Sequence, residues 1–133
     1  MDLIKKTRVV YVIEDDIELS TLMDRILKNI DPKISLDWST SAEEAIQSIS
    51  SNWKKGIVLP YVLIIIDIFL DGEKSGLDLY KLCIEKYPTI PIILTSSGNL
   101  KNILPINLGL SPTLLQKPFT VRKCKQIFKK ILS

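Results

Sequence analysis

The stretch IIIDIFLDG, residues 64–72, decides how this sequence should fold. Three isoleucines lead directly into a carboxylate, Asp67. A short run of β-branched apolar residues bounded by turn residues predicts a buried strand. An unpaired charge at the end of such a strand would cost several kcal/mol, so Asp67 needs access to solvent or a partner. We therefore expect that partner to come from elsewhere in the chain.

The composition is typical of one globular domain. The chain has 133 residues, of which 46% are hydrophobic and 25% are charged, enough to bury a core and too apolar for a disordered chain. No apolar run reaches the roughly 18 residues that span a bilayer. The first apolar run ends in acidic residues, unlike a signal peptide before its cleavage site. We expect a cytoplasmic protein with a single domain over residues 1–133 and its core at about 8–132.

The residue types that are absent or rare exclude several functions. The chain has no histidine, which excludes His-based acid–base catalysis, Ser-His-Asp triads and most zinc sites. Cys83 and Cys124 lack metal-type spacing, and we expect both to be buried on separate helices. The net charge is +3, and the lysines of residues 122–130 are expected to form a solvated helix face. We expect neither nucleic acid nor a membrane among the partners.

Apolar strand patterns alternate with helical patterns along the chain. Strands are expected at residues 9–13, 33–38, 61–66, 90–94 and 114–116. Helices are expected at 19–30 and 77–87. Two further helices begin at caps: one runs from Ser41 to a loop at 52–60, and one runs from Thr120 to Ile131. A short or broken helix is expected around Pro105 and Gly109. Fully apolar strands that alternate with helices predict a parallel sheet covered on both faces, which right-handed crossovers make a doubly wound α/β fold.

Polar residues follow the ends of the predicted strands. Ligand sites of open α/β sheets lie beyond the carboxyl ends of the strands, where the strand order switches. These positions hold Glu14 and Asp15, then Asp67, then Thr95 and Ser96, and finally Lys117. We therefore expect three acids, a hydroxyl group and a lysine to share one edge of the sheet.

Such a cluster of acids requires a cation. At about 4 Å and an effective dielectric constant near 20, each pair of carboxylates would cost about 4 kcal/mol. Oxygen ligands with open positions suit Mg²⁺, which retains waters and accepts phosphate oxygens. A carboxylate such as Asp67, beside Mg²⁺ and Lys117, is arranged as a nucleophile for phosphoryl transfer, and Thr95 would donate its hydroxyl to the bound phosphoryl group.

These motifs resemble those of the receiver domains of two-component response regulators, over essentially the whole chain. VVYVIEDDIEL (9–19) resembles their first strand with its acidic pair, and LIIIDIFLDGEKSGLDL (63–79) resembles the phospho-acceptor strand and loop. PIILTSSGN (91–99) resembles the switch-threonine strand, and LLQKPF (114–119) resembles the lysine that precedes a cis proline. The resemblance implies a flavodoxin-like (βα)5 sandwich with a five-stranded parallel sheet.

The resemblance also implies a role for each residue of the predicted site. Asp67 would be the phospho-acceptor. Asp15 would bind Mg²⁺ directly, Glu14 would bind it through water, and the backbone carbonyl of Phe69 would be a further ligand. Thr95 would be the switch hydroxyl, and Lys117 would pair with the phosphoryl group. The phosphate would come from a sensor histidine kinase or a phosphotransfer protein. Such a domain is a signalling module and not an enzyme, with only weak Mg²⁺-dependent self-phosphorylation and self-dephosphorylation.

Two assignments have alternatives. The acidic pair is either Glu14 with Asp15 or Asp15 with Asp16, and the end of the apolar strand at Ile13 favours the first. The switch hydroxyl is either Thr95 or Ser96. The distance onward to Lys117 favours Thr95, whereas the distance back to Pro91 favours Ser96.

Three departures from the family pattern concern the signalling surface. Leu114 replaces the aromatic residue expected three positions before the lysine, Pro105 falls where a helix is expected, and the loop after Asp67 has Asp71 in place of a proline and is lengthened by Glu73 and Lys74. We expect the chemistry to persist with an unusual output surface. The alternative is a pseudo-receiver, a scaffold that never carries phosphate. A dehalogenase-type hydrolase would need a second aspartate at the position of Phe69.

Overall fold

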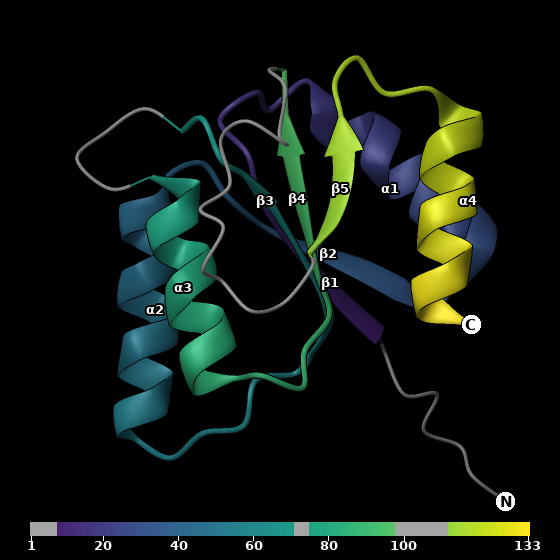
Figure 1. The fold of residues 1–133 in the computed structure, drawn as a ribbon. Coiled ribbons are helices and arrows are strands. Elements are labelled where there is room, and N and C mark those ends of the chain that lie inside the picture. The colour runs from purple at the N-terminus through teal and green to yellow at the C-terminus, as the bar shows by residue number, and fades with distance from the viewer. Residues whose placement is uncertain (1–7, 71–74, 98–111) are drawn as a thin grey trace, which may run out of the picture.

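A computed structural model describes residues 8–70, 75–97 and 112–133 (Figure 1). The strands of this part of the chain are β1 (Arg8–Ile13), β2 (Ile34–Ser39), β3 (Tyr61–Asp67), β4 (Ile92–Ser96) and β5 (Thr113–Gln116). The helices are α1 (Leu19–Ile30), α2 (Ala42–Lys54), α3 (Gly76–Lys86) and α4 (Val121–Leu132). The predicted broken helix with Pro105 and Gly109 lies outside the described residues, as do Asp71, Glu73 and Lys74. None of the described helices is long and apolar enough to cross a membrane.

All five strands are parallel and have the order β2-β1-β3-β4-β5. This is the doubly wound α/β fold predicted from the sequence. The strand order reverses between β1 and β3, so the carboxyl ends of these two strands frame a crevice. Helices α2 and α3 cover one face of the sheet, and α1 and α4 cover the other (Figure 1).

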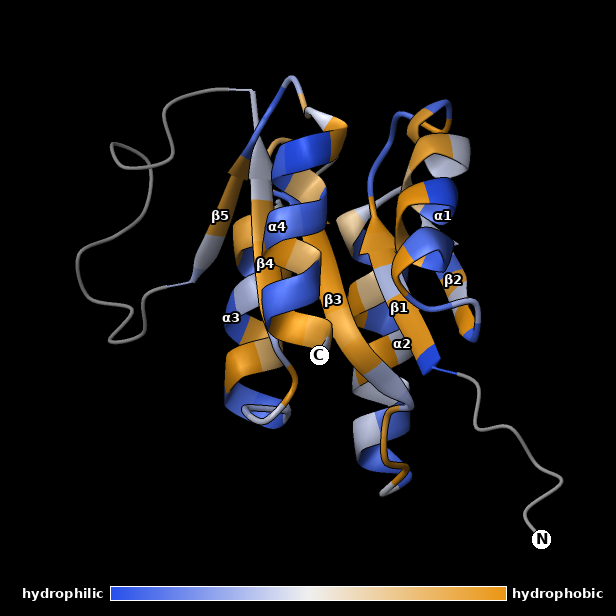
Figure 2. Ribbon diagram, turned by 90° about the vertical axis from the view of Figure 1, so that its right-hand side faces the viewer, coloured by the Kyte–Doolittle hydropathy of each residue, from blue (hydrophilic) through white to orange (hydrophobic). Residues whose placement is uncertain are grey.

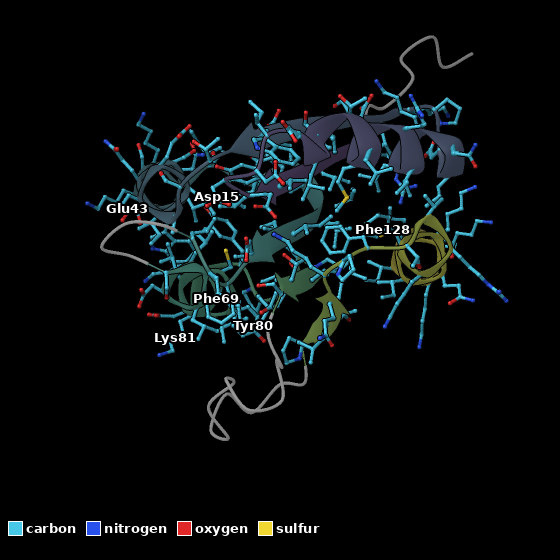
Figure 3. The ribbon with its side chains drawn as sticks, turned by 90° about the horizontal axis from the view of Figure 1, so that it is seen from above. Asp15, Glu43, Phe69, Tyr80, Lys81 and Phe128 are labelled. Carbon is cyan, nitrogen blue, oxygen red and sulfur yellow. The ribbon has the colours of Figure 1, made fainter. Side chains whose placement is uncertain are left out.

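The sheet separates two apolar clusters because alternate residues of a strand point to opposite faces. Ile64 and Ile66 pack with α2 and α3, whereas Leu63 and Ile65 pack with α1 and α4. Figure 2 shows apolar strands between helices whose outward faces are hydrophilic. Viewed from above, Tyr80 of α3 and Phe128 of α4 lie on opposite sides of the sheet (Figure 3).

The two cysteines lie in different apolar clusters. Cys83 is buried on α3 and Cys124 is buried on α4, on opposite faces of the sheet. The prediction of two buried thiols on separate helices is therefore confirmed. Burial raises the pKa of the Cys83 thiol to about 12, which disfavours its reactive thiolate.

Two predicted elements, β4 and α2, differ from the structure by two residues or more at a boundary. Strand β4 spans Ile92–Ser96 instead of 90–94, because Thr95 and Ser96 continue the ladder opposite Leu115 and Gln116 of β5. Helix α2 continues to Lys54, so the first part of the predicted loop at 52–60 is helical. Polar residues at a strand or helix end do not reveal where backbone pairing stops.

Candidate functional site

Asp67 is the last residue of β3 and is only 4% exposed. Its two carboxylate oxygens have different partners. Oδ1 accepts a hydrogen bond from the backbone N–H of Phe69 at 3.0 Å, and Oδ2 accepts one from Nζ of Lys117 at 3.1 Å. The partner that the apolar strand requires is therefore a lysine from the far end of the sequence.

Lys117 follows β5 and reaches back across the edge of the sheet. Its N–H donates to the carbonyl of Ser96 at 2.8 Å, and the Lys117–Pro118 peptide bond is cis, as the sequence resemblance implied. The ammonium group forms ion pairs with both Asp67 and Glu14. Burial acts to lower the pKa of Lys117, but the hydrogen bonds to Glu14 and Asp67 outweigh it and raise the pKa above its ordinary value. This lysine is therefore a fixed positive charge in the site.

Glu14 follows β1 and is 4% exposed. Its Oε2 accepts a hydrogen bond from the Asp16 N–H at 3.0 Å, and its backbone carbonyl accepts one from Nε1 of Trp38 at 3.0 Å. Sequence reasoning did not identify Trp38 as a neighbour of the site. The predicted strand at 33–38 gave no sign of this contact, although Val12 of β1 pairs with Trp38 directly.

Burial raises the pKa of Glu14 to about 7. The Lys117 ammonium group and the Asp16 N–H oppose this rise, and the carboxylates of Asp15 and Asp67 reinforce it. The site thus holds more negative charge than Lys117 alone neutralises. A carboxyl group that resists ionisation in such surroundings would ionise readily beside a divalent cation.

The three acids predicted for one edge of the sheet do meet there. Carboxylate oxygens of Glu14, Asp15 and Asp67 all lie within 4.8 Å of one another. Asp15 is exposed, whereas the other two are buried. Asp16 instead accepts a hydrogen bond from the Glu18 N–H at 3.1 Å. The geometry therefore favours Glu14 with Asp15 as the acidic pair.

Thr95 lies directly beside Asp67 in the register of β3 and β4. Both Thr95 and Ser96 are buried, at 2% and 0% exposure. Ile93 packs on the α1 and α4 side and Leu94 on the other, so alternation along the strand places Thr95 on the α1 and α4 side and Ser96 opposite. The same alternation places Asp67 on the side of Thr95, which favours Thr95 as the hydroxyl of the site.

Gly76, the first residue of α3, lies close against the backbone of Asp67. A Cβ atom at Gly76 would lie 2.1 Å from the Asp67 carbonyl oxygen and 2.7 Å from Cα of Ile68. Ser75 and Asp78 form a capping box that begins α3 at this point. Sequence reasoning missed this glycine, because a glycine in a predicted loop does not show what it touches.

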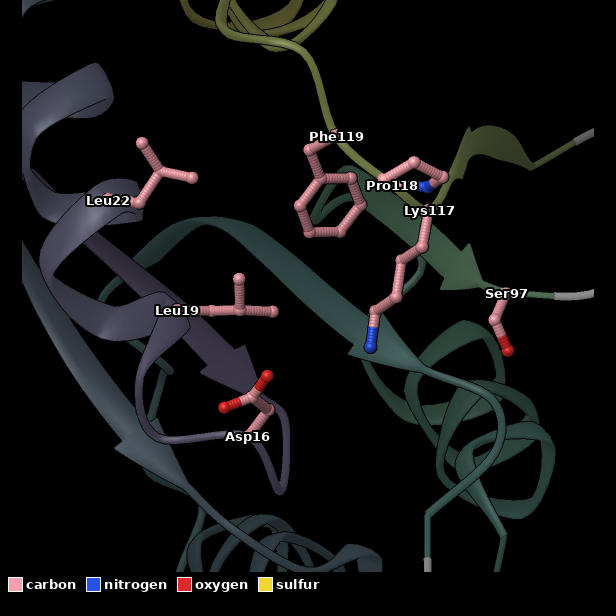
Figure 4. A pocket seen from close by; sticks show the side chains of 7 residues that line it. All are labelled: Asp16, Leu19, Leu22, Ser97, Lys117, Pro118 and Phe119. Carbon is pink, nitrogen blue, oxygen red and sulfur yellow. The ribbon is translucent and has the colours of Figure 1, made fainter.

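A pocket of about 470 Å³ opens beside the acidic cluster (Figure 4). Its walls are mainly apolar, and Asp16, Lys117 and Ser97 supply its polar groups; the apolar side chains are Leu19 and Leu22 of α1, with Pro118 and Phe119 from the segment before α4. The pocket therefore joins an apolar surface to the charged end of Lys117.

Two other residues singled out in the sequence have clear positions. The side chain of Phe69 is 51% exposed, and its carbonyl as a metal ligand stays a prediction. Leu114 is partly buried and packs against the apolar cluster on the α2 and α3 side. An aliphatic side chain thus fills the position where the family pattern has an aromatic ring.

The raised pKa of Glu14 predicts that stability falls as the pH rises. Between the ordinary pKa of 4.5 and about 7, the folded protein retains a proton that the unfolded chain releases. The unfolded state is therefore favoured increasingly as the pH rises over this range. Above pH 7 the contribution of this proton to the free energy of unfolding is lost. In the presence of a chelator, we expect the free energy of unfolding to fall by about 2 kcal/mol from pH 5.5 to 7.5.

Urea unfolding at a series of pH values measures this effect. Glu14→Gln cannot ionise, so its stability should change less over the same range. Equal pH dependence in the wild type and Glu14→Gln would contradict the assignment of this titration to Glu14.

Comparison with known proteins agrees with this geometry. No protein-family model matches the chain. No curated protein matches it either. Among solved structures, a two-component response regulator from Clostridium difficile has a TM-score of 0.73 and 25% identity, with 94% of this chain and 95% of that one covered. A putative response regulator from Chloroflexus aurantiacus has a TM-score of 0.71 and 26% identity, with 96% and 98% covered.

A third match is the structure of the histidine kinase ThkA in complex with the response regulator TrrA. Its TM-score is 0.71 and its identity is 24%, with 95% of this chain and 99% of that one covered. All three matches extend over nearly the full length of both chains. The resemblance noted in the sequence is confirmed: this chain has the fold of the receiver domains of response regulators.

Proposed function

We propose that this chain is a phospho-accepting receiver, in which Asp67 takes a phosphoryl group from a partner phosphohistidine in a Mg²⁺-dependent reaction. The observation that carries the proposal is the position of Lys117, whose ammonium group pairs with Asp67 and Glu14 at the edge where the three acids meet. In this proposal the chain signals from the cytoplasm by protein contact, as a module and not as an enzyme.

The acidic cluster fits Mg²⁺ by its donor chemistry. Glu14, Asp15 and Asp67 offer only carboxylate oxygens, which a hard cation prefers. Asp15 is exposed, so one side of the cluster is open to water and to a phosphoryl group. When bound, Mg²⁺ would neutralise charge on the phosphoryl oxygens, and Asp15, Glu14, Asp67 and the Phe69 carbonyl would hold it.

The proposed transfer forms one bond to phosphorus and breaks another. An oxygen of Asp67 attacks the phosphorus atom, the N–P bond of the phosphohistidine breaks, and the departing imidazole retains the electron pair and takes a proton. Lys117 stabilises the negative charge on the phosphoryl group, and Thr95 donates a hydrogen bond to it once it is bound. Phe69 keeps the carboxylate oriented through its backbone N–H, which donates to Oδ1 at 3.0 Å.

A histidine kinase or phosphotransfer protein is the proposed phosphate donor. The chain has no histidine and cannot carry the donor group itself. The similar protein TrrA is crystallised with the histidine kinase ThkA. The pocket of Leu19, Leu22, Pro118 and Phe119 lies beside Lys117, so it offers apolar contact area next to the acceptor (Figure 4).

Intact mass after incubation with acetyl phosphate tests the proposed function. We expect a single phosphoryl adduct that requires Mg²⁺ and is absent from Asp67→Asn. Asp37→Asn, an exposed aspartate on β2, removes the same charge away from the site and should leave the adduct unchanged. An adduct of equal yield in Asp67→Asn would overturn the assignment of the acceptor.

The position of Leu114 supports a second candidate, the pseudo-receiver. A packed aliphatic side chain at this place cannot undergo the ring movement that the family pattern couples to the switch hydroxyl. A folded protein that binds no Mg²⁺ and forms no adduct with acetyl phosphate or with phosphorylated kinase would support this candidate.

A further inference from the structure

The turn after α2 exposes an unusual number of apolar side chains. Within the described ranges, six large hydrophobic side chains are exposed, and three of them belong to residues 53–58. Trp53 is 47% exposed, Ile57 is 47% exposed and Val58 is 86% exposed. Single exposed apolar residues are ordinary, but a cluster of them indicates an interaction surface. Together with Lys54 and Lys55, these three residues are called the α2 tip below.

The α2 tip is held in one conformation by hydrogen bonds. Gly56 has a positive φ of 70°, which allows the chain to reverse at the end of α2. The N–H of Gly56 donates to the Trp53 carbonyl at 3.0 Å, and the N–H of Ile57 donates to Asn52 at 2.9 Å. The hydroxyl of Tyr87 donates to the Ile57 carbonyl at 3.1 Å. The exposed side chains are thus displayed by a fixed turn, and little ordering would be required on binding.

Trp53 is also fixed by contacts with α3. Its ring meets Tyr87 edge to face, with 5.7 Å between the ring centroids. Nζ of Lys86 lies 5.0 Å from the centroid of the Trp53 ring. These contacts anchor one part of the ring while 47% of the residue stays exposed.

The charge of the α2 tip is positive. Lys54 and Lys55 are exposed, and neither is in an ion pair with any residue that the structure describes. Lys86 pairs with Glu85 at 3.6 Å, so these two charges offset each other. Two ammonium groups without an ion-pair partner among the described residues therefore lie between the exposed tryptophan and the aliphatic side chains in the sequence.

We propose that the α2 tip docks on an anionic lipid surface. Tryptophan prefers the interface between water and lipid, aliphatic side chains enter the headgroup boundary, and lysines attract anionic headgroups. Val58 protrudes, and a fluid lipid surface accepts a protruding side chain without a preformed cavity. This proposal departs from our expectation of no membrane partner, because the sequence predicts a loop at 52–60 but does not show that its apolar side chains are displayed together on one turn.

The position of the α2 tip suits simultaneous contact with other proteins. The turn lies at the lower end of the sheet in Figure 1, whereas the carboxyl ends of β3 and β4 point to the upper end. Docking through the tip would therefore leave Asp67 and its pocket accessible to a phosphate donor. Docking of the tip on lipid would not depend on phosphorylation of Asp67.

Sedimentation of the full chain with vesicles tests the proposal. We expect binding to vesicles of phosphatidylcholine with phosphatidylserine, and much weaker binding to phosphatidylcholine alone. Val58→Asp should weaken binding about tenfold, because it places a charge at the apolar boundary. Val121→Asp is the matched control at an exposed valine of α4, and it should bind like the wild type.

A second pair of variants separates the α2 tip from the basic helix α4. Lys54→Gln with Lys55→Gln should weaken binding about tenfold, whereas Lys129→Gln with Lys130→Gln, the same change in charge on α4, should have little effect. Equal losses in both double variants would overturn the proposal, since α4 would then share the binding. Absence of wild-type binding, or unchanged binding of Val58→Asp, would also overturn it and leave the tip as a surface for an acidic protein.

Discussion

Replacing Gly76 with alanine should abolish phosphate acceptance at Asp67 and lower the free energy of unfolding by about 2–3 kcal/mol. The added Cβ would lie 2.1 Å from the Asp67 carbonyl oxygen, a distance that no relaxation of a flexible side chain can relieve. The three atoms nearest to the added Cβ all belong to the backbone of residues 67 and 68. Either α3 or the end of β3 must move, and movement of the β3 end would displace the acceptor carboxylate from Lys117.

Gly56→Ala is the matched control for this prediction. No atom of the described residues lies within 4 Å of a Cβ at Gly56, but its φ of 70° is unfavourable for alanine. We expect a loss of about 1–2 kcal/mol from backbone strain, with the phosphoryl adduct at Asp67 unchanged. Urea unfolding and intact mass after acetyl phosphate treatment measure both properties. A Gly76→Ala protein with normal stability and a normal adduct would contradict the close packing of α3 on β3.

Replacing Lys117 with methionine should destabilise the protein most at high pH in the absence of metal. The ammonium group is the shared partner of Asp67 and Glu14, whose side chains are each 5% exposed. Breaking a fully buried ion pair costs about 3–5 kcal/mol. Lys117 is 22% exposed and Glu14 can take up a proton, so we expect about 2 kcal/mol at pH 8 and less at pH 6.

Urea unfolding with chelator or with Mg²⁺ tests the role of Lys117. Mg²⁺ should stabilise Lys117→Met more than the wild type, because it replaces the missing positive charge. The matched control is Lys123→Met, at an exposed lysine of α4, which should change the free energy of unfolding by less than about 0.5 kcal/mol. Equal stability of Lys117→Met and the wild type at pH 8 would show that the acids do not need this cation.

The residues of the candidate site that directly follow a strand could be predicted from the sequence. Glu14, Asp67 and Lys117 each follow an apolar run, and parallel strands must bring their carboxyl ends to one edge. The meeting of Asp67 and Lys117 at one edge was therefore predicted, although their direct ion pair was not. The register of β4 against β5 was not predicted, because the polar residues that follow a strand do not reveal where backbone pairing stops.

Contacts made from the side of a strand were harder to predict. Gly76 allows close packing on the Asp67 backbone because it lacks a side chain, and Trp38 contacts the site through its ring N–H, which donates to the Glu14 carbonyl. Neither leaves a periodic pattern in the sequence. The grouping of Val58 with Trp53 and Ile57 on one exposed turn was similarly hidden, because a predicted loop does not show which of its side chains lie together.

The hydrogen bond from Trp38 to the Glu14 carbonyl places a fluorescent side chain next to the acidic cluster. The chain contains two tryptophans, Trp38 beside the acidic cluster and Trp53 in the α2 tip. Indole emission responds to nearby charge and to polarity, so the two rings are natural fluorophores for two separate surfaces. With one of them changed to phenylalanine, the emission of the other would follow cation occupancy near Glu14, or lipid contact at the tip, without any attached dye.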